Sequence, residues 1–284
     1  MKNRLRSAAL MVLLVLLFYP SLSGAGIYVE TLATGRIDWS NGVVEAIGIG
    51  VPPRKIANQA QARTLALQQA RVLAARNILK TLKTLRIDRD SLAKDMMLKH
   101  GFLGDQLKKL VYHAAEREIF FLPRNRVKMI LTVGIRCGLA DILLPESIRE
   151  IDHIKGGIPE KKGNSSESRE KKAFTGLVID CRGLKVTPAL VPHVLDEEGN
   201  EIYGPAIVTR REALRKGVAR YEKRIEDALR DPRIGANPLK VKAVRASGRN
   251  SCDIVLSNAD AARIIETPAN LGFLRSAGVI IVLD

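Results

Sequence analysis

The sequence predicts an α+β protein with two domains, each an antiparallel or mixed sheet packed with helices, joined by a polar linker after an N-terminal signal peptide. Two observations lead to this prediction. In the first half, extended runs rich in apolar residues enclose a long run that contains neither Gly nor Pro. In the second half, short apolar runs typical of buried strands alternate with helical segments and hairpin turns.

The domain boundaries follow from shifts in composition. We expect a signal peptide over residues 1–25, a first domain over 26–155, a flexible linker over 156–172 and a second domain over 173–284. The length of 284 residues suits two domains, and an apolar content of 46% is enough for two cores. The linker is polar, charged and nearly free of apolar residues, so it cannot bury a core of its own.

The N-terminus has the pattern of a secretory signal. Basic residues precede an apolar run over 8–18, and small residues stand at the expected cleavage point between Ala25 and Gly26. An uncleaved anchor is the alternative, although the run is shorter than the ~20 residues that a membrane span needs. No Cys lies near the cleavage point, so we expect an exported protein of the periplasm or cell envelope without N-terminal lipidation.

The first domain is expected to open with a hairpin. Asn41-Gly42 stands between two extended runs, a strong signal for a tight turn. Glycines 48 and 50 interrupt the second run, which indicates either a bulge or a close backbone approach. Residues 55–85 then form a long predicted helix, because they consist of good helix formers. Its small Ala side chains would let it lie close to a sheet.

A second helix is predicted over residues 91–110, capped by Asp90-Ser91 and broken at Gly101. Two further strands are expected to meet at a turn over 123–125, and the second of them alternates apolar and polar residues cleanly. The first domain is therefore predicted as ββ-αα-ββ, with helices on one side of an antiparallel sheet.

The second domain is predicted as a mixed set of strands and helices. Strands are expected over 175–180, 238–247, 252–257 and 279–283, with a hairpin across 197–200. Helices are expected over 210–229, over 259–266 behind a cap at Asn258, and over 271–278.

The charge balance limits the choice of partners. A formal net charge of +16 should attract the protein to anionic surfaces such as lipid head groups or acidic polysaccharide, although solubility alone would also explain it. Aromatic residues make up only 4% of the chain, too few for a base-stacking platform, and no recognition module is present. We therefore expect no nucleic-acid partner.

The strongest catalytic candidates are Asp180, Cys181 and His193. A cysteine nucleophile needs a base within hydrogen-bond reach, and His193 is the His of the second domain. No thiol-enzyme signature surrounds Cys181, and Asp180 suits a turn in which it accepts backbone hydrogen bonds. We therefore favour an architectural role for this stretch, and an exported enzyme using these three residues is the alternative.

Signals for cofactors and metals are missing. The four histidines have no paired spacing; they are His100, His113, His153 and His193. The glycine-rich run over 48–53 lacks the third Gly and the Lys of phosphate-binding loops. The sequence predicts neither a metal site nor a cofactor.

Three cysteines, Cys137, Cys181 and Cys252, cannot all pair within one chain. Cys181 and Cys252 fall in the same predicted domain beside apolar runs, so a disulfide between them is one interpretation for an exported protein. Buried, unpaired thiols that act as small hydrophobic side chains are the interpretation we favour.

Residues 43–136 resemble the exported twenty-kilodalton LPP-type lipoprotein family, and are also similar to the N-terminal domain of the flagellar T-ring assembly protein. The shared pattern is a Gly-rich strand, a proline and an Ala-rich helix. It rests on Gly48, Gly50, Pro53, Ala62, Ala66, Ala70, Ala74, Arg76, Asn77 and Leu79. The resemblance implies a non-catalytic envelope protein and brings no catalytic residues. The chain departs from lipoproteins at Gly26, where they carry a Cys.

These observations favour an exported, non-catalytic bacterial envelope protein that acts in structure, assembly or binding, with a flagellum- or envelope-associated role open. Its expected partner is an envelope protein or an anionic envelope surface, and a homo-oligomer is also open. Two alternatives stay: an exported enzyme with a Cys/His/Asp site in the second domain, and a binder of anionic polymers or membrane surfaces.

Overall fold

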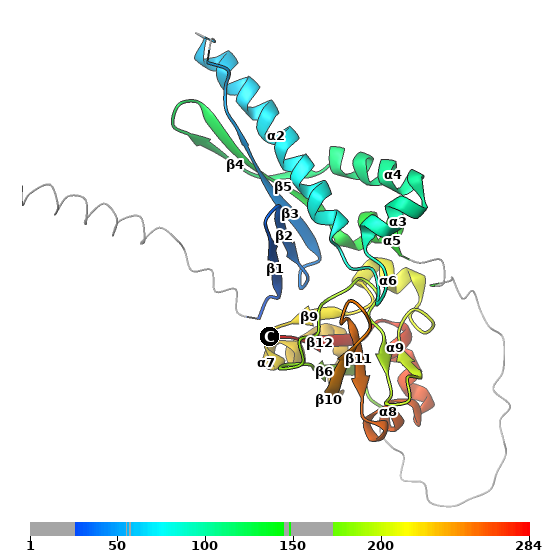
Figure 1. Cartoon of the computed structure of the whole chain (residues 1–284). Coiled ribbons are helices and arrows are strands. Elements are labelled where there is room, and N and C mark those ends of the chain that lie inside the picture. Colours follow the sequence, from blue (N-terminus) through cyan, green and yellow to red (C-terminus); the bar gives the residue numbers. More distant parts are fainter. Residues whose placement is uncertain (1–25, 55, 57, 145–147, 149–172) are drawn as a thin grey trace, which may run out of the picture.

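The structure, a computed structural model, describes residues 26–54, 56, 58–144, 148 and 173–284. The predicted α+β class is confirmed, since helices accompany one antiparallel sheet and one mixed sheet. Each sheet draws its strands from one of the two predicted segments, and the two units stand end to end (Figure 1). The predicted signal peptide and the predicted linker over 156–172 lie outside the described residues. Within the described part, no helix is long and apolar enough to cross a bilayer.

The first sheet is antiparallel and has the strand order β1-β2-β3-β5-β4. Its strands are β1 (Val29–Leu32), β2 (Gly35–Asp38), β3 (Val43–Gly50), β4 (Ala115–Leu122) and β5 (Arg126–Gly134). The hairpin at Asn41-Gly42 and the turn over 123–125 lie where the sequence predicts them. Strand β1 was not predicted, because it is short and only half-buried.

The helices of the first unit are α2 (Gln59–Lys83), α3 (Ala93–Lys99), α4 (Gly101–Tyr112) and α5 (Ala140–Leu143), with a short π-helix η1 (Ile135–Leu139). The break at Gly101 is as predicted. Helix α2 begins later than predicted because the Asn58 side chain caps it, accepting from the amides of Ala60 and Gln61. The predicted cap at Asp90-Ser91 is wrong: Leu92 is the N-cap of α3, and both residues belong to a turn closed by Asp88.

Helix α2 lies unusually close to β3. A Cβ atom on Gly48 would stand 1.9 Å from the carbonyl oxygen of Ala70, and one on Gly50 would stand 1.8 Å from that of Ala66. Both alanines are fully buried. The two glycines therefore mark a close backbone approach and not a bulge, because β3 keeps an unbroken register with β5 along its whole length.

The second sheet is mixed and has the order β8-β7-β11-β10-β6-β12-β9. Its strands are β6 (Gly176–Asp180), β7 (Val194–Leu195), β8 (Glu201–Tyr203), β9 (Arg220–Glu222), β10 (Pro238–Ser247), β11 (Asp253–Leu256) and β12 (Val279–Val282). Strands β10, β6, β12 and β9 run parallel, while β10 with β11 and β7 with β8 form antiparallel pairs.

The helical segments of this unit are α6 (Arg210–Lys216), α7 (Ile225–Arg230), η2 (Pro232–Ile234), α8 (Asn258–Ile265), η3 (Pro268–Asn270) and α9 (Leu271–Arg275). The single helix predicted over 210–229 is wrong. Gly217, at a φ of 80°, ends α6, and β9 follows before α7 begins. The cap of α8 is Ser257 and not Asn258, since the Ser257 side chain accepts from the Asp260 amide.

The two units are joined by polar contacts around one aromatic pair. Arg86, which follows α2, donates to the carbonyl of Pro188 at 2.7 Å and forms an ion pair with Glu30. The Trp39 indole donates to the same carboxylate at 3.0 Å. Its ring stands edge-on to Tyr221 of β9, with centroids 5.7 Å apart. One cluster of buried apolar residues runs through both units, so they are docked and not merely tethered.

The close contact between α2 and β3 can be tested by adding one methyl group. We expect Gly48→Ala to lower the free energy of unfolding by at least about 2 kcal/mol, because the methyl would meet helix backbone that cannot rotate away. Urea unfolding followed by circular dichroism measures the change.

Gly101→Ala is the matched control. Apart from its chain neighbours and the backbone of its own helix, no described atom lies within 4 Å of a Cβ atom at Gly101, so this variant should be as stable as the wild type or slightly more stable. An equal loss of stability in both variants would contradict the close-contact interpretation.

Candidate functional site

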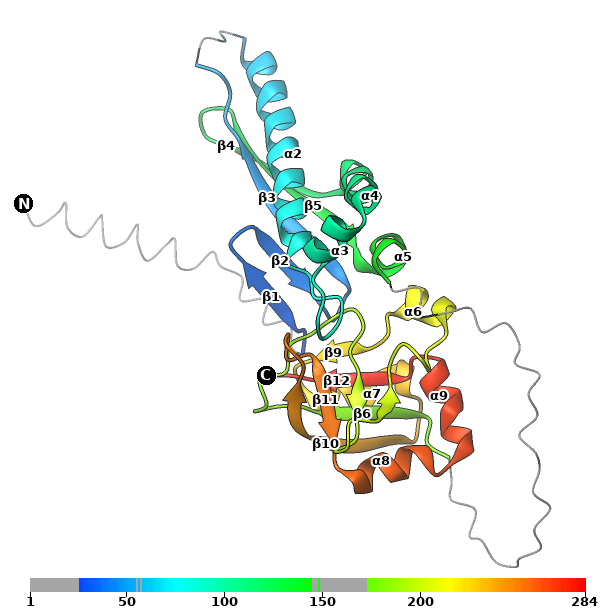
Figure 2. The same cartoon turned by 45° about the vertical axis from the view of Figure 1, so that its right-hand side comes forward.

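Strand β3 has an open edge. Its pairing with β2 covers only Val43 to Glu45, whereas its pairing with β5 continues to Gly50. Residues 46–50 therefore lack a strand partner on the β2 side. Figure 2 shows β3 running past the short β1–β2 hairpin toward the far end of the first unit. Such an edge offers unpaired backbone groups to another strand.

The pairing register fixes which backbone groups face this edge. The Ile135 amide donates to the carbonyl of Gly42 at 2.8 Å, so even-numbered residues of β3 bond to β5 and odd-numbered residues point the other way. The outward groups thus belong to Ile47, Ile49 and Val51.

Helix α2 supplies side-chain amides to part of the edge. Asn77 Nδ2 donates to the carbonyl of Ile47 at 2.8 Å, and the Val51 amide donates to Gln69 Oε1 at 2.6 Å. A carboxamide has the same donor and acceptor groups as a peptide unit. Among the described residues, no hydrogen bond reaches the amides of Ile47 and Ile49 or the carbonyl of Ile49.

A groove of 430 Å³ adjoins the open edge. It is lined by the β1–β2 hairpin over 31–36, by Glu45, Ala46 and Ile47 of β3, by Asn77, and by Lys128 and Ile130 of β5. On the sheet face beside it, Ile47 and Ile49 are 44% and 47% exposed. Exposed apolar side chains next to unpaired backbone groups are typical of a surface that another chain covers.

Charge is organised around the groove. Glu45 is only 6% exposed, and two arginines, Arg36 at 2.5 Å and Arg117, neutralise it. On the same face, the Lys128 ammonium lies 5.2 Å from the centre of the Phe120 ring. The helix side of the edge carries Arg76 beside Asn77, and no acidic residue occurs within α2. The surroundings of the open edge are therefore basic.

The arrangement is suited to binding an extended segment. A strand added along residues 46–50 would take up the free backbone groups, while its side chains would meet Ile47 and Ile49 on one face. This site was not predicted from the sequence. Its signal is that apolar residues occupy both alternating sets of β3, since Val44 and Ala46 face the helix and the two isoleucines face outward.

The structure does not bring the three catalytic candidates together. Cys181 follows β6 and His193 precedes β7, and β11 and β10 lie between these strands. Neighbouring strands lie ~4.8 Å apart, so β6 and β7 are separated by roughly 14 Å. His193 Nδ1 instead lies 2.9 Å from Glu201, and that contact holds the pKa of the Glu201 carboxyl below its usual range. The Asp180 carboxylate is held by Arg182 at 2.8 and 2.7 Å, which lowers its pKa.

Cys181 and Cys252 are both buried free thiols. Burial raises the pKa of the Cys181 thiol, and it raises the pKa of Cys252 to about 12. A thiol with a raised pKa is protonated near neutral pH and is a poor nucleophile. Both residues therefore serve as small apolar side chains in this structure, and no disulfide joins them.

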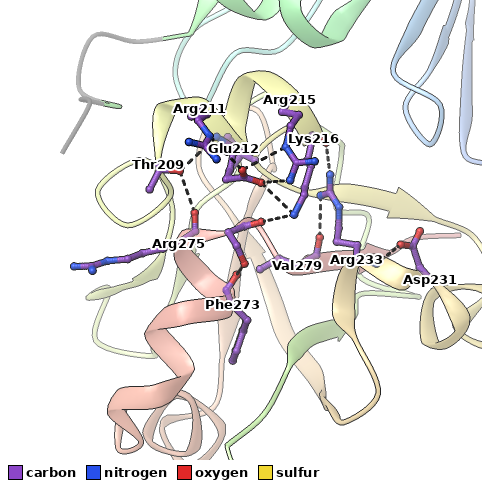
Figure 3. A network of polar contacts seen from close by, with 12 residues as sticks. Thr209, Arg211, Glu212, Arg215, Lys216, Asp231, Arg233, Phe273, Arg275 and Val279 are labelled. Carbon is purple, nitrogen blue, oxygen red and sulfur yellow. Dashed lines mark hydrogen bonds and ion pairs between the residues drawn. The ribbon is translucent and has the colours of Figure 1, made fainter. Parts of the chain in front are cut away.

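A network of polar contacts fastens α6 to the second sheet (Figure 3). Glu212 accepts from Arg215 at 2.7 Å and pairs with Lys216 at 3.1 Å; the hydrogen bond from Arg215 is the main cause that lowers the pKa of Glu212. Lys216 also donates to the carbonyl of Ser276, the residue after α9, at 3.2 Å. Arg233 donates to the carbonyls of Lys216 and Val279, and burial lowers its pKa to about 10. These cations meet internal acceptors, which indicates a structural role.

Three other observations carry less information. A hollow of 690 Å³ lies between α3, α4, α5 and α6, and its charged groups, Arg210 and Asp141, pair with each other at 3.4 Å. In the part of the chain that the structure describes, no three His, Cys, Asp or Glu side chains cluster as metal ligands would. Gly26 is described and buried, whereas Ala25, on the other side of the predicted cleavage point, lies outside the described residues.

Comparison with protein families gives a match in the second unit. A family model of the second domain of Treponema pallidum Tp0624 matches residues 176–284, from the first residue of β6 to Asp284. This part of the chain is thus similar to one domain of a bacterial protein with more than one domain. The match covers less than half of the chain and leaves out the first sheet. No curated protein matches the chain.

The state of the thiols can be counted chemically. In a Cys137→Ser variant we expect dithionitrobenzoate to detect no thiol in the native protein, because Cys181 and Cys252 are buried. After denaturation without a reductant, it should detect both. A thiol that reacts in the native state would support an accessible nucleophile, and none after denaturation would mean a disulfide.

Proposed function

We propose that this protein is an exported, non-catalytic component of the bacterial cell envelope that binds another envelope protein along the open edge of β3. The edge over residues 46–50 is the observation that carries the proposal. It combines free backbone groups, exposed isoleucines and an adjoining groove in one place. The similarity of residues 176–284 to a domain of Treponema pallidum Tp0624 supports a bacterial source.

The partner supplies an extended segment with apolar residues at alternate positions and acidic residues at its flanks. Alternation follows from the pleat, since only every second side chain of an added strand meets Ile47 and Ile49. Acidic flanks follow from the basic surroundings, where Arg76 and Lys128 border the edge and the groove. A second copy fits less well, because a chain of net charge +16 would bring like charges together.

In this proposal the first unit of the protein is an LPP-type-like module, in line with the resemblance of residues 43–136. The same proposal includes an association of the protein with the flagellar T-ring region. The second unit carries no assembled catalytic group among its described residues, and its role is to hold the first through their shared core. A binder of anionic polymers is the second candidate, which the charge of +16 favours.

Site-specific photo-crosslinking in the producing bacterium tests the proposal. A photoreactive residue in place of Ile49 should crosslink to one envelope protein, because this side chain flanks the added strand. The same probe in place of Val72 is the control, since Val72 is 59% exposed on the outer face of α2. Equal crosslinking at both positions, or none at Ile49, would contradict the proposal.

Two variants then separate the two candidates. Ile47→Asp should weaken retention of the crosslinked partner at least tenfold, because it places a charge on the apolar contact. Lys109→Gln, on the exposed face of α4, should change it little. A polymer binder would show the reverse order, together with binding that falls steeply as salt rises.

A further inference from the structure

The first described residues are fixed to the second unit. Ile27 forms an antiparallel bridge with Glu222 of β9, and the Lys223 amide donates to the carbonyl of Gly26 at 2.8 Å. Gly26 is itself buried. In both views the start of β1 lies beside β9 (Figure 1, Figure 2). The residue that follows the predicted cleavage point is therefore part of the folded protein.

An unsatisfied carboxylate oxygen faces this residue. Oδ2 of Asp227, in the first turn of α7, is buried and receives no hydrogen bond from the described residues. Among these residues it forms an ion pair with Arg224, whose Nε lies 3.7 Å away. A Cβ atom built on Gly26 would stand 2.2 Å from this oxygen. A buried acceptor without a donor is energetically costly. Because this oxygen faces Gly26, we expect a hydrogen-bond donor at that residue.

Covalent geometry places the Gly26 nitrogen close to the same oxygen. The nitrogen of a residue lies ~2.5 Å from its Cβ position, so it is within about 4.7 Å of Asp227 Oδ2. A peptide nitrogen at this point has one donor with a fixed direction. A free α-ammonium has three donors that rotate, and a small movement brings one of them into hydrogen-bond contact.

We propose that cleavage between Ala25 and Gly26 completes the fold, because the new α-ammonium of Gly26 forms an ion pair with Asp227. The step is hydrolysis by a signal peptidase: water adds to the Ala25 carbonyl, the peptide bond to Gly26 breaks, Ala25 leaves as a carboxylate, and the Gly26 nitrogen takes up both protons of the water to become an ammonium group. This inference rests on the export in the proposed function. It adds a maturation site whose product is an internal contact.

Glycine suits this position on two grounds. Its φ of 87° is strained for other residues, and any Cβ atom would collide with the carboxylate. The other charged groups around the site are Arg224 and Glu226 of α7, Glu222 and Lys223 beside them, and the Arg220–Asp231 pair. Glu226 is 57% exposed and pairs with Arg224 at 3.8 Å, which makes it a suitable control.

The titration of the α-amine tests the inference. The chain is released from a fusion so that it begins at Gly26, and its α-nitrogen is followed by NMR. An ordinary α-amine has a pKa of about 7.7–8.0, and pairing with a carboxylate raises it. We expect a pKa at least one unit higher in the wild type, the ordinary value in Asp227→Asn, and the raised value in Glu226→Gln.

The stability of the chain should follow the same titration. A raised amine pKa stabilises the folded state below the ordinary value, and this contribution is lost as pH rises through the folded pKa. A chain with one added N-terminal Ala should therefore melt about 2–4 °C lower than the Gly26 chain at pH 7 and at the same temperature at pH 10.5. An ordinary amine pKa in the wild type, or equal melting at pH 7, would overturn the inference.

The mass of the native protein separates this inference from the proposed export. A native chain that begins at Gly26 supports both. The amine could titrate as expected while the native chain keeps its leader. The ion pair between the ammonium and Asp227 would then stand, but cleavage in the cell, and with it the maturation step, would be refuted. If the native chain begins at Gly26 but the amine has an ordinary pKa, export stands and the ion pair is refuted.

Discussion

The close contact between α2 and β3 is the constraint on which the rest of the first unit depends. Gly48 and Gly50 let the helix backbone rest on the strand, and Ala66, Ala70 and Ala74 form the facing row. Larger side chains would lift the helix and move its flank away from the edge of β3. Because the helix lies so close, Gln69 and Asn77 reach backbone groups at that edge. The packing and the candidate site are thus consequences of one feature. Two side-chain amides bond to backbone groups at this edge, so the edge can stay without a strand partner and not aggregate. A partner strand can displace these amides, because its peptide groups offer the same donors and acceptors.

The second unit supports the first unit through direct contacts. Trp39 and Arg86 of the first unit meet Tyr221 and Pro188 of the second, and their apolar surroundings belong to one buried cluster. The contacts around Lys216 and Arg233 tie α6 to the start of β12 (Figure 3). Because the second unit is docked against the first and the first sheet extends away from it, the protein is suited to holding a partner in a fixed direction.

Local patterns predicted most of the elements, and tertiary contacts decided the rest. The helix over α2, the break between α3 and α4 at Gly101 and the hairpin at Asn41-Gly42 follow from composition and turn chemistry. The helix predicted over 210–229 failed because a short strand, β9, is stabilised by parallel pairing with β12, which no local pattern reports. Cys181 and His193 were plausible partners by composition alone, and only the strand order shows the distance between them. The open edge was unpredictable for the same reason: it depends on where β2 ends relative to β3.

The central claim is that alternate backbone groups of β3 face an uncovered edge. Amide hydrogen exchange of the isolated protein, read residue by residue by NMR, tests this claim most directly. The account predicts an alternation, with fast exchange at Ile47 and Ile49 and slow exchange at Ala46, Gly48 and Gly50, whose amides bond to β5. Uniform protection from residue 46 to residue 50 would contradict it, because the edge would then already be covered and could not receive a strand.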